Sequence, residues 1–151
     1  MIRLALMDHY EPNLLMGNRA CSFINFASIG SFIRQPPASV AYFCDGMLMS
    51  GFMSRVPGQP VQRVSFDFTS IADPVLRDAE QQHLRVYIVG ATQSELEAFI
   101  AKLRVRYPQL IIAGAHNGYF NQAQAKNLHA DIRTTGANLL LVGLGAGLQE
   151  S

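Results

Sequence analysis

Residues 138–150 read Asn138-Leu-Leu-Leu-Val-Gly143-Leu-Gly145-Ala-Gly-Leu-Gln149-Glu150. The apolar run 139–142 is short, free of charge and bounded by turn residues, which predicts a buried strand. This strand leads into a glycine-rich loop that carries Gln149 and Glu150 side by side. In an open α/β sheet, ligands bind just beyond the carboxyl ends of the strands. The loop is therefore a candidate binding site.

The loop does not match the dinucleotide-binding fingerprint. Gly143 and Gly145 begin a Gly-x-Gly-x-x-Gly pattern, but its sixth position is Leu148. The sequence stops at Ser151, so no helix follows that could present its N-terminus to a pyrophosphate. A nicotinamide or flavin dinucleotide is therefore not the expected ligand.

Residues 84–143 predict an alternation of strands and helices. The expected strands are 85–90, 110–113 and 139–142. One helix begins at a capping box, Thr92-Gln-Ser-Glu95, presents an apolar face and ends before Pro108. Asn121 can cap a second helix, with Ala125, Leu128 and Ile132 on one side and Gly136 at its end.

Short connections and right-handed crossovers make the three strands parallel. The loops after them contain glycine, at Gly90, within 114–120 and within 143–147. Because parallel strands end at the same edge of a sheet, we expect these three loops to lie together.

The first half of the chain predicts two further strands, at 21–26 and 40–44. A short helix is expected over 27–33, and Asp45-Gly46 follows the second strand. A loop over 54–63 carries an arginine at each end, and a helix is expected from Asp73, as N-cap, to about Gln82.

Composition limits the possible functions. The chain has 151 residues, of which 49% are hydrophobic and 15% charged, as in one ordered domain spanning 1–151. A net charge of +1 and the lack of a basic run give no reason to expect nucleic acid. No apolar run approaches the ~20 residues that span a bilayer. Cys21 and Cys44 are too few for a disulfide framework, and the chain is expected to be cytoplasmic. Its apolar, nearly neutral composition predicts self-association into a homo-oligomer.

The segment 143–150 resembles the Gly-x-Gly-x-Pro-Lys-Gln-Glu signature of the WecG/TagA/CpsF glycosyltransferases. Gly147 and Leu148 stand where the family has Pro and Lys, and Ile24 where a Thr usually precedes the Asn. Further matches occur in the family's order: Asn25, Asp45-Gly46, Arg63, Val89-Gly90, Tyr107-Pro108 and Gly118-Tyr119-Phe120.

The resemblance implies an α/β, Rossmann-like fold, a mostly parallel sheet with flanking helices. It implies transfer of a sugar, such as N-acetylmannosamine or a related hexose, from UDP to an undecaprenyl-diphosphate-linked saccharide in cell-envelope or exopolysaccharide assembly. The implied reaction inverts the configuration of the transferred sugar. It would be independent of metal or other cofactors, and the sequence has no Asp-x-Asp motif that could hold a divalent ion on UDP. The enzyme would work in the cytoplasm or in peripheral contact with the inner face of the membrane.

The C-terminal segment that family members normally carry is absent from this sequence. An alternative expectation is therefore a short relative with weak or no turnover, which would act as a nucleotide-sugar-binding or interaction subunit.

Asp45 is the candidate catalytic residue. A carboxylate at a strand end can accept the proton of an attacking sugar hydroxyl, and an ordinary Asp is already ionised at neutral pH. The residues alone favour a simple Asp-Gly turn, whereas the resemblance implies a catalytic base.

The remaining candidates are substrate-binding residues that the resemblance implies. Asn25 could instead cap the helix after it, and the residues do not decide between these roles. Tyr119 could contact the nucleotide-sugar or pack into the core. An arginine such as Arg63 could meet diphosphate oxygens or be solvated. The full set is Asn25, Gly46, Arg63, Gly90, Gly118, Tyr119, Gly143, Gly145, Gln149 and Glu150.

Overall fold

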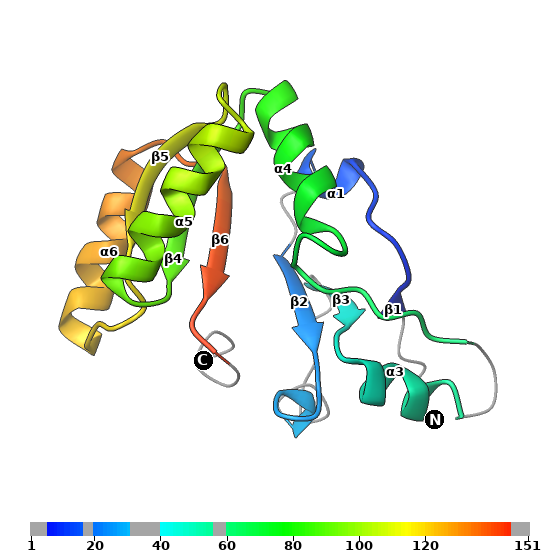
Figure 1. The fold of residues 1–151 in the computed structure, drawn as a ribbon. Coiled ribbons are helices and arrows are strands. Elements are labelled where there is room, and N and C mark those ends of the chain that lie inside the picture. Colours follow the sequence, from blue (N-terminus) through cyan, green and yellow to red (C-terminus); the bar gives the residue numbers. More distant parts are fainter. Residues whose placement is uncertain (1–5, 17–19, 31–39, 56–59, 146–151) are drawn as a thin grey trace. The chain divides into compact units, whose positions relative to one another are not determined.

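The computed structural model describes residues 6–16, 20–30, 40–55 and 60–145 (Figure 1). The chain divides into two compact units, residues 1–75 and residues 76–149, and each contains its own sheet. The boundary falls within helix α4 (Ala72–Gln81). The expectation of one domain over 1–151 stays a prediction.

The first unit contains a three-stranded parallel sheet whose middle strand is β3. In β3 and its neighbour β2, residue Ala20 pairs with Val40 and Ile24 with Cys44, so both strands end at the same level. Phe23 and Phe43 stack with ring centroids 5.3 Å apart, which joins the two strands through their side chains. In sheet order the strands are β1 (Leu6–Met7), β3 (Val40–Cys44) and β2 (Ala20–Ile24), and the helices are α1 (Asn13–Met16) and α3 (Met47–Met53).

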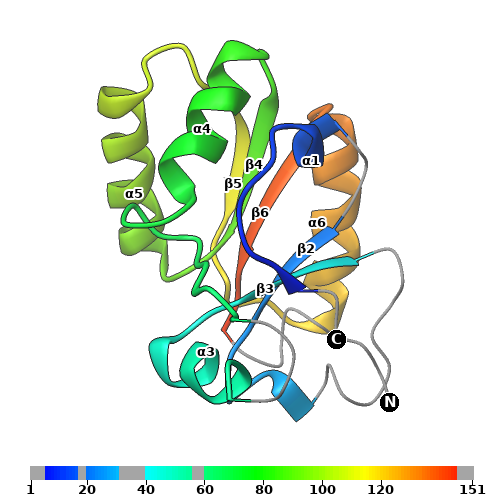
Figure 2. The same ribbon diagram turned by 90° about the vertical axis from the view of Figure 1, so that its right-hand side faces the viewer.

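The second unit contains the sheet β5-β4-β6, also parallel. Successive residues of β4 point to opposite faces. Val86 and Ile88 pack with α5 and the end of α4, whereas Tyr87 and Val89 pack with α6. Figure 2 shows α5 and α6 on opposite sides of these strands. The elements are β4 (Arg85–Gly90), α5 (Gln93–Arg106), β5 (Ile111–His116), α6 (Gln122–Thr134) and β6 (Leu139–Gly143).

The α/β class with parallel sheets and flanking helices is confirmed, and several local predictions hold. Strands β3 and β4 have the predicted bounds. Thr92 and Glu95 form the capping box of α5, and Asn121 caps α6 with Gln124 as its partner. Gly136 follows α6 with φ +64°, as expected for a helix exit.

Other predictions were wrong. The strands form two three-stranded sheets instead of one. Helix α4 begins at Ala72, so Asp73 lies in its first turn and is not the cap. Strand β5 continues to His116, which places Gly114 inside the strand. There a Cβ would lie 2.5 Å from Tyr87 Cε2, so the ring of Tyr87 fills the space beside the glycine.

Strand β6 is not buried as predicted. Leu140 and Val142 are 46% and 43% exposed, because β6 lies at the edge of the sheet and pairs with β4 on one side in the part of the chain that the structure describes. In the first unit, β2 ends at Ile24 and a turn follows over 26–28. Of the expected helix 27–33 the structure describes residues 27–30, and of these only 29–30 are helical.

Among the described residues, no helix is both long enough and apolar enough to cross a bilayer.

Candidate functional site

Two glycines, Gly90 and Gly118, allow close backbone packing at the carboxyl edge of the second sheet. A Cβ on Gly90, where φ is +150°, would lie 2.5 Å from the carbonyl oxygen of Gly143. A Cβ on Gly118 would lie 3.2 Å from Gly90 Cα, and the Gly118 amide donates to the Ala91 carbonyl at 2.9 Å. Gly90 and Gly118 therefore let two strand ends and a loop approach closely. The nearest atoms are backbone atoms of Gly143 for Gly90, and the Leu144 side chain with the backbone of Gly90 and Ala91 for Gly118.

Gly143 and Gly145 are different. A Cβ on either would meet no atom within 4 Å, and Gly145 has φ +87°. The space beside these two glycines is therefore open in the described part of the chain. Contact of this loop with a ligand stays a prediction. Gln149 and Glu150 lie outside the described residues.

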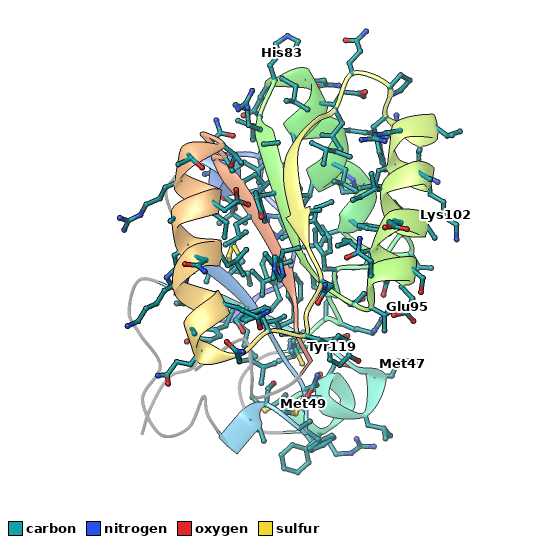
Figure 3. The ribbon with its side chains drawn as sticks, turned by 90° about the vertical axis from the view of Figure 1, so that its left-hand side faces the viewer. Met47, Met49, His83, Glu95, Lys102 and Tyr119 are labelled. Atoms are coloured by element: carbon teal, nitrogen blue, oxygen red, sulfur yellow. The ribbon has the colours of Figure 1, made fainter. Side chains whose placement is uncertain are left out.

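Tyr119 is 74% exposed, and Figure 3 shows it at the same end of this unit as Glu95, opposite His83. Its amide donates to Asn117 Oδ1 at 3.0 Å, and Asn117 Nδ2 donates to Gln93 Oε1 at 3.4 Å. The tyrosine ring is thus available to a ligand. The alternative of core packing holds for the neighbouring Phe120, which packs into the core with its ring 5.6 Å from that of His116.

Asn117 was missed by sequence reasoning. Its signal is an amide side chain directly after a strand and before a glycine, a position typical of a turn-forming residue.

A small hollow of about 250 Å³ in this unit is lined by His116, Gln124, Asn127, Leu128 and Asp131. Clefts that hold small-molecule ligands typically measure about 300–1,000 Å³. Beside it, burial and the hydrogen bond from its hydroxyl to Asp131 raise the pKa of Tyr87 to about 12. This arrangement joins β4 to α6, and we assign it a role in packing.

The carboxyl edge of the first sheet carries Asp45. Its amide donates to the Ile24 carbonyl at 2.8 Å, which ties the end of β3 to the end of β2. Gly46 has φ +91° and turns the chain into α3. Glycine adopts this positive φ without strain, in agreement with the predicted tight turn. The side chain of Asp45 is 32% exposed, so a substrate hydroxyl could reach the carboxylate.

Arg63 lies between two carboxylates. Its Nε is 3.6 Å from Asp45 Oδ1, and its Nη2 donates to Asp67 Oδ2 at 2.8 Å. The alternative of a simply solvated arginine therefore fails for this residue. Arg55, the other arginine of the predicted loop, instead donates to the Gly51 carbonyl of the preceding helix α3 at 2.9 Å.

Asp67 was also missed by sequence reasoning. The Ser65 hydroxyl first, then that of Thr69, and with them the Arg63 guanidinium, hold the pKa of the Asp67 carboxyl well below its usual range. A possible signal in the sequence was the spacing of Asp67 four residues after Arg63, but such pairs are common on solvated surfaces.

Asn25 caps the turn that follows it. Its Oδ1 accepts from the amides of Ala27 at 2.9 Å and Ser28 at 3.1 Å, and its own amide donates to Ser28 Oγ. The capping role, one of the two left open by the sequence, is thus present. Contact between Asn25 and an acceptor sugar stays a prediction.

The segments that follow β2 and β3 at this edge carry four exposed apolar side chains: Phe26, Met47, Leu48 and Phe52. We call them the apolar rim. They are between 54% and 81% exposed, and the rings of Phe26 and Phe52 lie 6.1 Å apart. Phe26 is next to Asn25, and Met47 is two residues after Asp45. The candidate catalytic carboxylate therefore has exposed hydrocarbon close to it in the chain.

The structure thus brings the predicted site residues together in two groups. Asn25, Asp45, Gly46 and Arg63 form the first group, at one edge of the first unit. The second group lies at the carboxyl edge of the second unit and consists of Gly90, Gly118, Tyr119, Gly143 and Gly145.

Comparison with known proteins gives two findings. The model of the glycosyl transferase WecG/TagA/CpsF family matches residues 37–151, which is more than half of the chain. A UDP-Gal:alpha-D-GlcNAc-diphosphoundecaprenol beta-1,4-galactosyltransferase from Shigella boydii is 29% identical over 108 residues. The match covers 72% of this chain and 46% of the relative, so the chain spans about half the length of that enzyme.

Proposed function

The chain belongs to the WecG/TagA/CpsF family of glycosyltransferases, and on that basis we propose that it transfers a hexose from a UDP donor to an undecaprenyl-diphosphate-linked saccharide. The observation that carries this proposal is the placement of Asp45 at a strand end, partly exposed and beside Arg63. This pairing places a proton acceptor next to a cation. Asp45 can take the proton of the attacking hydroxyl, and Arg63 can meet an anionic oxygen of the lipid-linked acceptor.

In the proposed reaction, Asp45 accepts the proton of the acceptor hydroxyl as its oxygen attacks the anomeric carbon of the donor. The bond from that carbon to the UDP oxygen breaks, and the configuration inverts. The negative charge on the diphosphate must be met by donors in place beforehand. In the first unit, Arg63 is suited to an anionic oxygen of the acceptor's own diphosphate, because a guanidinium matches phosphate oxygens two at a time.

The direct test is an assay of the purified chain with UDP-galactose and UDP-N-acetylmannosamine, using a synthetic GlcNAc-diphospholipid as acceptor. Mass spectrometry of the lipid would reveal an added hexose. A product with one of these donors supports the proposal. Binding of UDP without any product would instead favour the alternative of a nucleotide-sugar-binding subunit.

We expect UDP to bind at the second group of site residues. Open backbone at Gly143 and Gly145 and the exposed ring of Tyr119 support this prediction. On addition of UDP, the largest amide chemical shift changes should fall on residues 90, 117–119 and 143–145. Tyr119→Ala should raise the dissociation constant about tenfold, since stacking of a base on an aromatic ring contributes ~1–3 kcal/mol.

Val105→Ala serves as the control, because Val105 is 84% exposed on α5 and belongs to neither group. Shift changes restricted to residues 83–85 and 107–110, at the opposite edge of the sheet, would contradict this assignment of the donor site.

We expect the apolar rim to contact the hydrocarbon chain of the acceptor. Leu48 is 81% exposed, so its burial against the lipid chain would stabilise the complex with the acceptor. Full burial of a leucine side chain contributes ~1.5–3 kcal/mol to the free energy. Leu48→Ser should therefore raise KM about tenfold for a long-chain acceptor. The KM for a short-chain, water-soluble acceptor with the same sugar should stay unchanged.

Val105→Ser is the matched control, since it removes an equally exposed apolar side chain from another helix. An equal rise of KM for both acceptors in Leu48→Ser would exclude a contact with the lipid chain. Self-association and a location at the inner face of the membrane stay predictions.

A further inference from the structure

The carboxylate of Asp67 divides its hydrogen bonds between two tasks. Oδ1 accepts from the amide and the hydroxyl of Thr69, two residues later in the chain. Oδ2 accepts from Ser65 Oγ and from Arg63 Nη2. One oxygen therefore shapes the local turn, and the other faces the arginine that lies beside Asp45.

The segment that carries Asp67 is held firmly to its surroundings. The Asp67 carbonyl accepts from the amides of Ser70 at 3.0 Å and Ala72 at 3.1 Å, at the start of α4. Ser65 is only 4% exposed. On the other side, the amide of Val64 donates to the Cys44 carbonyl at 2.8 Å, next to Asp45. Asp67 is thus a fixed partner for a side chain that would otherwise be flexible.

Arg63 makes its close contact with Asp67, not with Asp45. The Nη2–Oδ2 distance to Asp67 is 2.8 Å, whereas the Nε–Oδ1 distance to Asp45 is 3.6 Å, longer than a hydrogen bond. The guanidinium has five N–H donors in a rigid plane. Anchoring one of its ends fixes the direction in which the others point.

We propose that Asp67 is a positioning residue that holds the Arg63 guanidinium beside Asp45. The contacts above support this position of the guanidinium. The consequence for sugar transfer rests on the proposed function: Arg63 would meet an anionic oxygen of a substrate, while Asp45 remains unbonded and able to accept a proton.

The competing explanation is that Asp67 only builds its turn. Asp67→Asn separates the two roles. An asparagine oxygen can still accept from the amide and hydroxyl of Thr69, but an NH2 group then replaces Oδ2 and faces the donors of Arg63. Thr69→Val is the matched control, since it removes a hydroxyl bond on the turn side and leaves the Arg63 side intact.

The experiment measures the Nη–Hη groups of Arg63 by ¹⁵N NMR, with the signals assigned from their loss in Arg63→Lys. In the natural protein we expect slow hydrogen exchange at Nη2, which donates to Asp67. Exchange should become at least about tenfold faster in Asp67→Asn, because a bond to a charged partner contributes ~1.5–3 kcal/mol. Thr69→Val should leave the exchange rate unchanged.

An unchanged Arg63 signal in Asp67→Asn would overturn the proposal, and so would equal acceleration in Thr69→Val. Asp67→Glu, which keeps the charge but moves the carboxylate by one methylene, provides a second measurement if Asp67→Asn does not fold. An intermediate exchange rate is expected there. A rate equal to that of the natural protein would contradict the proposal, since moving the carboxylate that bonds Nη2 would then have no effect on Arg63.

Transfer kinetics test the consequence separately. Asp67→Asn should lower kcat/KM for the acceptor by up to about 10²-fold, the effect of small misplacements near reacting groups. UDP affinity should not change, and Asp67→Glu should restore part of the activity. If the natural chain transfers no sugar, the proposed function fails. The NMR result still decides whether Asp67 positions Arg63.

Discussion

Asp45→Asn is expected to lower the rate of sugar transfer by about 10²–10⁴-fold, the usual contribution of a general base. The asparagine occupies the same space and can keep the backbone bond to Ile24, but it cannot accept a proton from the acceptor hydroxyl. The affinity for UDP should remain within a factor of about two, because the groups expected to bind UDP lie in the second unit. Steady-state transfer rates and calorimetric titration with UDP would measure the two effects.

Glu11→Gln is a suitable control, since it neutralises another carboxylate of the first unit that is 45% exposed. Transfer by this variant should match that of the natural chain. If transfer by Asp45→Asn also matches it, Asp45 is a turn residue, and the proton must leave by another route.

Gly90→Ala is expected to destabilise the chain by about 2–5 kcal/mol, from the strain of a positive φ and from overpacking. The new Cβ would lie 2.5 Å from the Gly143 carbonyl oxygen and 2.9 Å from its carbon, and both are backbone atoms that cannot rotate away. The ends of β4 and β6 would have to separate. Urea denaturation of the two proteins gives the difference in the free energy of unfolding.

Gly143→Ala is the matched variant at the same edge. Its Cβ would meet nothing within 4 Å, so stability should change by less than about 1 kcal/mol. UDP binding should nevertheless weaken, because the methyl group occupies the open space beside the proposed donor site. Equal stability of Gly90→Ala and the natural chain would show that the strand ends can separate at little cost.

Much of the second unit could be predicted because its signals are local. The capping boxes of α5 and α6 involve residues three apart, and the apolar faces of both helices repeat along a single segment. Strand β4 is buried on both faces and therefore appears in the sequence as a continuous apolar run, so its bounds could be predicted from that run. The glycine-bearing ends on one edge then followed from the handedness of the crossovers.

Helix α3 was not predicted because its sequence carries weak signals. Met47–Met53 is short and contains Gly51, and its N-cap is a glycine without a side-chain bond. Its apolar residues do not mark a buried face either, since Met49 is 2% exposed but Met47 and Leu48 are about 80% exposed. The apolar rim beside Asp45 could therefore be recognised only once the helix was in place.

The sequence by itself determined the α/β class, the order of the elements in the second unit, the family and the two strand ends that carry Asp45 and the glycines. These depend on periodicity, capping and motif order, which act between near neighbours. The tertiary structure alone decided that β6 is an exposed edge, that Gly90 is filled by Gly143, and that Arg63 is held by Asp67 beside Asp45. Each of these features depends on which backbone segment or carboxylate lies opposite a residue after folding. The sequence does not contain that information, because an apolar run has the same sequence whether it is buried or exposed, and a charged pair has the same sequence whether it is bonded or solvated.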